Sequence, residues 1–126
     1  AEGRTVLSDR FALSTEAYQM IGRGLPPEVV LPANRAVAGG LQPDLTLILD
    51  LPPAVGRARQ EAAGKRLDRL DQEDLEFLKR VSDYYLAVRG NGVRHLNGRL
   101  PPDRLLQEAW EEIVRVAPDK FGGTTD

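Results

Sequence analysis

The amino-acid sequence predicts an α/β fold in which a parallel β-sheet is flanked by helices, and three observations support it. Segments with helical spacing of apolar residues alternate with short β-prone segments along the chain. Residues 45–49 are almost entirely apolar, which is typical of a parallel strand buried between helices. The segments between the expected strands are long enough to hold the helices of right-handed crossovers.

Length and composition limit the kind of protein this is. The 126 residues suit one domain or a large part of one, and 41% hydrophobic with 29% charged residues is ordinary for a globular protein. Lys and Arg number 17 against 19 Asp and Glu, a net charge of −2. This balance argues against a protein that coats nucleic acid. Of the basic residues 14 are Arg, the side chain suited to bidentate binding of phosphates.

Cysteine usage and hydropathy exclude further classes. The chain has no cysteine, which rules out disulfides, zinc–thiolate sites and thiol nucleophiles. No apolar run approaches the roughly 18 residues of a membrane span, and no cleavable signal leads the sequence. We therefore expect a cytoplasmic protein without a membrane partner.

The first third of the chain predicts one strand and two helices. Residues 4–8 form a β-prone run, and Ser14 is placed to cap a helix that extends to residue 21. A second helix is expected over residues 28–37, ended by the glycine pair that begins at Gly39.

The remaining chain continues the alternation. In order, the sequence predicts a strand at 45–49 closed by Asp50, a helix from 52 toward 64, a helix at 71–88, a strand at 93–96 and a helix at 101–116. Residues 1–117 then read as the second, C-terminal half of a single doubly wound domain, and residues 118–126 as a flexible tail.

An Asp-Arg pair ends the first expected strand, where open parallel sheets bind their ligands. The guanidinium fork of Arg10 suits a phosphate, while the Asp9 carboxylate suits a water bound to Mg²⁺ or a basic partner. The alternative is a pair that only caps the local backbone.

Polar side chains follow on the adjoining helix. Thr15, Tyr18 and Gln19 have i, i+3, i+4 spacing, so an α-helix would place a hydroxyl, a ring and an amide on one face. These groups suit hydrogen bonds to a base edge and a sugar, with the ring packed on the nucleoside. The alternative is that Tyr18 packs in the core with its hydroxyl at the rim.

A basic segment surrounds Gly64. Between residues 57 and 69 there are two acidic residues and five basic ones: Arg57, Arg59, Lys65, Arg66 and Arg69. A glycine inside such a segment fits a mobile lid over a polyphosphate. The alternative is a charged face that water covers.

The ordered set of these motifs resembles the thymidylate kinase family. Residues 9–11 (Asp-Arg-Phe) and 14–19 (Ser-Thr-Glu-Ala-Tyr-Gln) match an Asp-Arg-aromatic triplet followed by Ser-x-x-Ala-Tyr-Gln. The similarity continues through residues 22–24, 43–56 and 67–69, and only the chain after about Val116 lies outside it.

The resemblance implies a P-loop NTPase-like three-layer fold and a nucleoside monophosphate kinase. Such an enzyme transfers the γ-phosphoryl of ATP, with Mg²⁺, to dTMP and gives dTDP for dTTP biosynthesis; the family is commonly homodimeric. Other nucleoside or nucleotide kinases with a similar Asp-Arg motif remain an alternative. A non-catalytic paralogue or fragment that only binds nucleotide is another.

The resemblance also assigns residues to the acceptor nucleotide. Arg10 matches the arginine that grips the acceptor phosphate, and Asp9 matches the acid that acts on Mg²⁺ through water. Tyr18 occupies the place of a ring that packs near the deoxyribose and disfavours a 2′-hydroxyl. Thr15 is placed to read the thymine edge. The implied substrate-binding set is Arg10, Ser14, Thr15, Tyr18 and Gln19.

The basic segment matches the family's lid, whose arginines help to stabilise the transferring phosphoryl. The catalytic candidates are Arg10, Arg59, Lys65 and Arg66. Residues 60–63 (Gln-Glu-Ala-Ala) replace the several arginines that relatives with a basic lid often have there, which leaves open which candidate acts.

The family's Gly-x-x-x-x-Gly-Lys-Ser/Thr loop for ATP is absent from the sequence. The one Gly-Lys pair, residues 64–65, is followed by Arg66 and has Arg59 where the first glycine belongs. We therefore expect that the family's N-terminal portion is not part of this sequence, and that the 126-residue chain alone is inactive.

Overall fold

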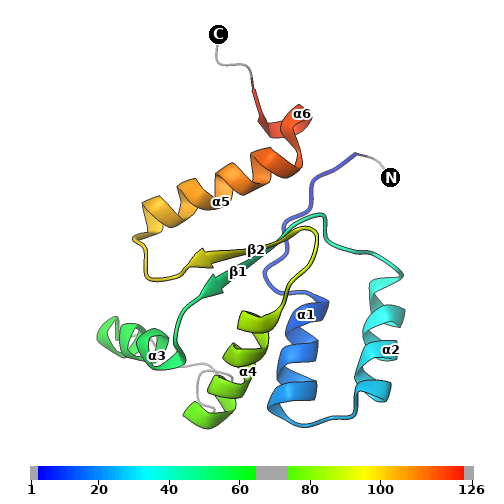
Figure 1. Ribbon diagram of the computed structural model, residues 1–126, viewed down its shortest axis with the longest axis vertical. Coiled ribbons are helices and arrows are strands. Elements are labelled where there is room, and N and C mark those ends of the chain that lie inside the picture. The colour runs from blue at the N-terminus through cyan, green and yellow to red at the C-terminus, as the bar shows by residue number, and fades with distance from the viewer. Residues whose placement is uncertain (1–2, 65–73, 124–126) are drawn as a thin grey trace. The chain divides into compact units, whose positions relative to one another are not determined.

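The computed structural model describes residues 3–64 and 74–123, and these form two compact units, Ala1–Leu41 and Gln42–Asp126. Figure 1 shows the course of the chain. The first unit holds helices α1 (Ala12–Thr15) and α2 (Pro27–Ala38) with the π-helix η1 (Glu16–Gly22) between them. The second unit alternates strands and helices, which confirms the expected α/β class with a parallel sheet.

Helix α1 begins three residues earlier than the sequence predicts. Its N-cap is Phe11, in an extended conformation with φ −149°, and the Ser14 N–H already donates to the Phe11 carbonyl at 2.9 Å. The prediction that Ser14 is the N-cap is therefore wrong. The reason is that Arg10 takes a positive φ of 69°, which turns the chain and starts the helix sooner.

The run at residues 4–8 is not a strand, contrary to its β-prone sequence. Val6 and Leu7 are 84% and 95% exposed. A strand exists only when its backbone pairs in a ladder, and within the described residues the sheet contains two strands, neither of them from this segment.

Helix α2 is as the sequence predicts, with small shifts at its ends. Pro27 lies in its first turn, where the missing N–H has no helical partner to lose. Gly39 ends it in the left-handed conformation at φ 58°.

The second unit is built on two parallel strands. β1 (Thr46–Asp50) pairs with β2 (Val93–Asn97), with Ile48 opposite His95. The helices are α3 (Pro53–Ala62), α4 (Leu75–Ala87), α5 (Pro102–Val116) and α6 (Pro118–Phe121). In Figure 1, α5 lies on one side of the strand pair, and α3 and α4 lie on the other. The short helix α6 falls in the segment that was expected to be a tail.

The core of the second unit lies between the strands and α4. Ile48 and Leu96 are buried in the strands, and Phe77 and Val81 are buried on α4. The expectation that β1 is buried on both faces is wrong, because Leu49 is 56% exposed.

Helix α4 begins at Leu75, after an N-cap in which the Asp74 carboxylate accepts from the Phe77 N–H at 2.7 Å. The part of this helix predicted for residues 71–73 lies outside the described residues. Across residues 3–64 and 74–123, no helix is long and apolar enough to cross a membrane.

Candidate functional site

Arg10 has an unusual backbone and a defined side-chain partner. It is the non-glycine residue with positive φ in the described chain, and the Ser8 hydroxyl donates to its carbonyl at 2.8 Å. Its guanidinium carbon lies 5.2 Å from the centre of the Tyr18 ring, a cation–π contact. A strained left-handed residue persists when its surroundings hold it, and such residues concentrate at ligand sites.

Tyr18 and Gln19 lie in the π-helix rather than in the α-helix that the sequence predicts. The Arg23 N–H donates to the Tyr18 carbonyl at 3.0 Å, five residues back, and the Leu25 N–H donates to the Gln19 carbonyl at 2.9 Å. Because the turn is wider, the i, i+3, i+4 rule no longer defines a common face with Thr15, the exposed last residue of α1. Short π-helical segments are frequent at functional sites.

The structure brings Arg10 and Tyr18 together, as two of the residues in the implied substrate-binding set. Ser14 lies within α1, half-buried, and Gln19 is half-buried in η1. Asp9 is exposed, immediately before the Arg10 turn. A guanidinium beside a ring can bind a phosphate while the ring packs against a sugar or base.

Asn34 is a polar residue of this unit that the sequence reasoning missed. From α2 it donates its Nδ2 hydrogens to the Ala12 carbonyl at 2.9 Å and to Glu16 Oε1 at 3.4 Å. The available signal was an amide among the apolar residues of a helix, where a half-buried polar side chain is expected to have a hydrogen-bond partner.

In the second unit, a carboxylate and an imidazole meet at the carboxyl end of β1. His95 Nδ1 lies 2.9 and 3.0 Å from the two Asp50 oxygens, and its Nε2 lies 2.9 Å from the Val88 carbonyl. The hydrogen bond to Asp50, followed by that to Val88, raises the pKa of His95 above its ordinary value; burial and the Arg89 guanidinium partly oppose this. Sequence reasoning selected Asp50 at this strand end but not His95.

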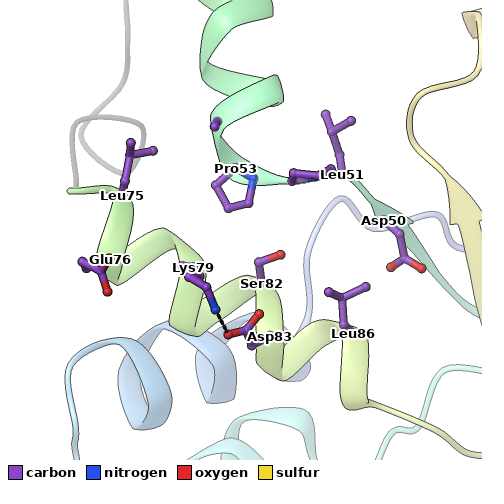
Figure 2. Close-up of a pocket in the computed structure, with 11 residues that line it drawn as sticks. Asp50, Leu51, Pro53, Leu75, Glu76, Lys79, Ser82, Asp83 and Leu86 are labelled. Carbon is purple, nitrogen blue, oxygen red and sulfur yellow. Dashed lines mark hydrogen bonds and ion pairs between the residues drawn. The ribbon is translucent and has the colours of Figure 1, made fainter.

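A pocket of about 440 Å³ opens beside the same strand end. Figure 2 shows its walls, which come from the β1–α3 connection and from α4. Leu51, Pro53 and Leu86 give it an apolar surface. At its margin, Lys79 Nζ and Asp83 Oδ2 form an exposed ion pair at 2.6 Å.

Arg59 joins α3 to the turn after β2. Its Nη1 donates to the Gly98 carbonyl at 2.8 Å, and its Nη2 donates to the Arg99 carbonyl at 3.3 Å. Arg57 is half-buried on the same helix. The other members of the predicted lid, Lys65, Arg66 and Arg69, lie outside the described residues.

The donors available for a metal are few. Within the part of the chain that the structure describes, no three His, Asp or Glu side chains gather into a cluster that could hold a metal ion. Asp9 offers a single carboxylate beside Arg10. Mg²⁺ is commonly held by one or two carboxylates, phosphate oxygens and waters, so this donor fits an indirect role through water.

The family model and three curated relatives that match this chain all carry the same family description. The family model described as thymidylate kinase matches residues 1–108. A thymidylate kinase of Thermomicrobium roseum is 40% identical over 117 residues, which cover 90% of this chain and 56% of that protein.

Two further curated relatives are also thymidylate kinases. One from a Synechococcus strain is 52% identical over 88 residues (70% of this chain, 41% of the relative). One from Lacticaseibacillus casei is 36% identical over 126 aligned positions (96% of this chain, 59% of the relative). The chain thus spans about half the length of the curated relatives it matches. Since the family model covers most of the sequence, this chain belongs to the thymidylate kinase family.

Proposed function

We propose that this chain supplies the acceptor-nucleotide site and part of the lid of a kinase that transfers the γ-phosphoryl of ATP to dTMP, giving dTDP for dTTP biosynthesis. The observation that carries the proposal is the Arg10 guanidinium held over the Tyr18 ring, on a strained backbone, inside the segment that matches the family. Phosphoryl transfer depends on positioning and positive charge more than on covalent chemistry, and this arrangement provides both.

The proposed roles follow from side-chain chemistry. The Arg10 guanidinium, 5.2 Å from the centre of the Tyr18 ring, offers a fork of N–H groups that suits bidentate binding of the acceptor phosphate. The Tyr18 ring then packs near the deoxyribose, where it disfavours a 2′-hydroxyl. Ser14, Thr15 and Gln19 supply hydroxyl and amide groups for the thymine edge and the sugar.

The phosphate donor is ATP with Mg²⁺, and ATP supplies the γ-phosphoryl group when bound. Asp9 is the residue that would hold the Mg²⁺ ion, through a bound water. Arg57 and Arg59 belong to the lid at the end of α3, and Arg59, Lys65 and Arg66 are the candidates that stabilise the transferring phosphoryl. We refer to a polypeptide that contains this chain together with a Gly-x-x-x-x-Gly-Lys-Ser/Thr loop as the complete kinase.

We also propose that the complete kinase is a cytoplasmic homodimer. Helix α2 presents exposed apolar side chains, with Val29 59% and Val37 91% exposed, which suit burial against a second copy. The near-neutral net charge of the chain argues against a protein that coats nucleic acid.

The test compares acceptors and Arg10 variants in the complete kinase. We expect ATP-dependent phosphorylation of dTMP and not of thymidine. Arg10→Ala should lower dTMP turnover by roughly 10²-fold or more, the scale of one lost preorganised charge contact. Arg10→Lys should recover only part of the rate, because an ammonium cannot form the bidentate fork. Arg35→Ala removes an exposed arginine of α2 and serves as the matched control.

Three outcomes would contradict the proposal. Full activity in Arg10→Ala would show that the guanidinium only supports local structure. Phosphorylation of thymidine in place of dTMP would indicate a nucleoside kinase. Binding of dTMP and ATP without turnover in the wild-type complete kinase would indicate a non-catalytic paralogue.

A further inference from the structure

Asn34 links helix α2 to the junction where helix α1 is followed by the π-helix η1. Its amide group donates to the Ala12 carbonyl at 2.9 Å and to Glu16 Oε1 at 3.4 Å. Ala12 opens α1, and Glu16 is the first residue of η1, so the single side chain of Asn34 contacts both helical segments. All three residues lie in the compact unit Ala1–Leu41.

The two acceptors of Asn34 lie in the turn where α-helical hydrogen bonding ends. The Glu16 N–H donates to both the Ala12 and the Leu13 carbonyls. The regular α-helical pattern of one hydrogen bond to the residue four positions back therefore already changes at Glu16. The following turn is π-helical, and the Arg23 N–H reaches back five residues to the Tyr18 carbonyl. A side chain that binds a helical carbonyl is one of the recognised causes of local departures from α-helical geometry.

This junction decides where Tyr18 lies. Ala17, the residue between Glu16 and Tyr18, is completely buried, so this part of η1 has little freedom to rotate. In this structure the Tyr18 ring lies 5.2 Å from the Arg10 guanidinium carbon. If the segment were a continuous α-helix, the Tyr18 side chain would point in a different direction. The cation–π pair therefore depends on the change from α- to π-helix.

We propose that Asn34 is a positioning residue for the acceptor nucleotide: by holding the Ala12 carbonyl and the Glu16 carboxylate, it maintains the α1–η1 junction and thereby the Arg10–Tyr18 pair. The proposal rests on the proposed function, because it assigns Asn34 to the same acceptor site. Asn34 itself does not touch the reacting atoms. Its effect is expected on recognition of dTMP and not on recognition of ATP.

The experiment measures the KM values for dTMP and ATP in the complete kinase. In Asn34→Ala, the KM for dTMP should rise roughly tenfold, the scale of one or two lost hydrogen bonds, while the KM for ATP stays within about twofold. Asn34→Asp should raise the KM for dTMP at least as much, because a carboxylate would face the Ala12 carbonyl and the Glu16 carboxylate. Asn34→Gln keeps the amide donor and should recover part of the loss.

A second readout does not depend on activity. Amide hydrogen exchange of residues 16–23 should become faster in Asn34→Ala and remain near wild type in Asn34→Gln, since the amide holds this turn. Arg35→Ala, on the adjacent exposed position of α2, is the matched control and should change neither KM nor the exchange rates.

The outcomes separate this proposal from the proposed function. A wild-type complete kinase that does not phosphorylate dTMP would defeat the proposed function and, with it, the assignment of Asn34 to that site. An active wild type whose Asn34→Ala variant keeps its KM for dTMP would overturn the role of Asn34 alone. A parallel rise in both KM values would show general destabilisation and would also overturn it. If Asn34→Ala does not fold, the KM values for dTMP and ATP are compared in the isosteric Asn34→Asp variant instead.

Discussion

His95 is the single histidine of the chain, and at the residue scale its imidazole joins three segments. Nδ1 faces the Asp50 carboxylate from β1, and Nε2 faces the Val88 carbonyl at the end of α4. The Arg89 Nη1 lies 3.1 Å from the same Nε2 and favours the neutral ring. The two acceptor groups prevail, so the folded protein raises the pKa of His95 above its ordinary value of 6.5.

The raised pKa makes stability depend on pH. Because the folded state binds the proton more tightly than the unfolded chain, this stabilisation is fully present below pH 6.5 and is lost as the pH rises through the higher pKa of the folded state. Urea unfolding of the chain should therefore give a free energy of unfolding that declines as the pH rises above 6.5 and through the raised pKa of His95 in the folded state.

Two variants check the cause of this decline. His95→Asn should remove the decline with pH, and at acidic pH it should lower the free energy of unfolding by on the order of 1 kcal/mol. Asp50→Asn should weaken it, because the main partner of the imidazolium is lost. A decline that persists unchanged in His95→Asn would assign the pH dependence to other groups.

At the element scale, the carboxyl ends of the two strands are joined through Gly98. The Gly98 N–H donates to the Asp50 carbonyl at 3.0 Å, and the Gly98 carbonyl accepts from Arg59 of α3. A Cβ at this position would lie 3.0 Å from the Asp50 carbonyl oxygen and 3.1 Å from Leu51 Cβ. These distances are shorter than ordinary van der Waals contacts, so a Cβ would push against the Asp50 carbonyl and the turn after β2 favours glycine.

This geometry predicts opposite effects for two glycines of the same unit. Gly98→Ala should destabilise the chain by about 1–3 kcal/mol, the usual cost of forcing atoms into a packed site. Gly56→Ala is the matched control: it lies in α3, its Cβ would meet Leu51 Cδ2 at an ordinary 3.6 Å, and it should stabilise by about 0.5–1 kcal/mol. Thermal unfolding measures the stability of both variants against the wild type. Equal changes in stability would contradict the inference that a Cβ at position 98 crowds the Asp50 carbonyl.

At the scale of the whole molecule, the chain is two compact units, and the described residues of the second unit form a sheet of two strands. Parallel strands are normally covered on both faces, yet Leu49 of β1 is 56% exposed. The matched part of the chain covers only 56% and 59% of the length of two of its relatives. The sequence also contains no loop of the kind that cradles the β- and γ-phosphates of ATP.

We therefore expect the 126-residue chain alone not to phosphorylate dTMP. Without the backbone amides and the lysine of such a loop, ATP loses most of the contacts that orient its γ-phosphoryl group. The measurement is ATP-dependent formation of dTDP by the purified chain, with the complete kinase as the positive control. Turnover by the chain at a rate similar to that of the complete kinase would show that another group in the chain binds the phosphates.

Much of the fold was predictable from local patterns. The helices α2 to α5 and both strands follow from apolar periodicity and from glycine and proline signals, which act within a few residues. The errors concern residues whose state depends on distant partners. Residues 4–8 have β propensity but no strand beside them. On α4, Phe77 is buried whereas Leu75 is 45% exposed, because burial depends on what the helix packs against.

The candidate site divides in the same way. The sequence by itself determined the family, the Asp-Arg pair and the neighbouring Tyr18, because these are ordered motifs that can be read along the chain. Only the tertiary structure decided that Arg10 adopts a left-handed backbone over the Tyr18 ring and that Asn34 reaches Ala12, a contact across 22 residues. The physical reason is that motifs and periodicity report the chemistry of each residue and its near neighbours, whereas a hydrogen bond or a ring contact between segments exists only after packing has brought them together.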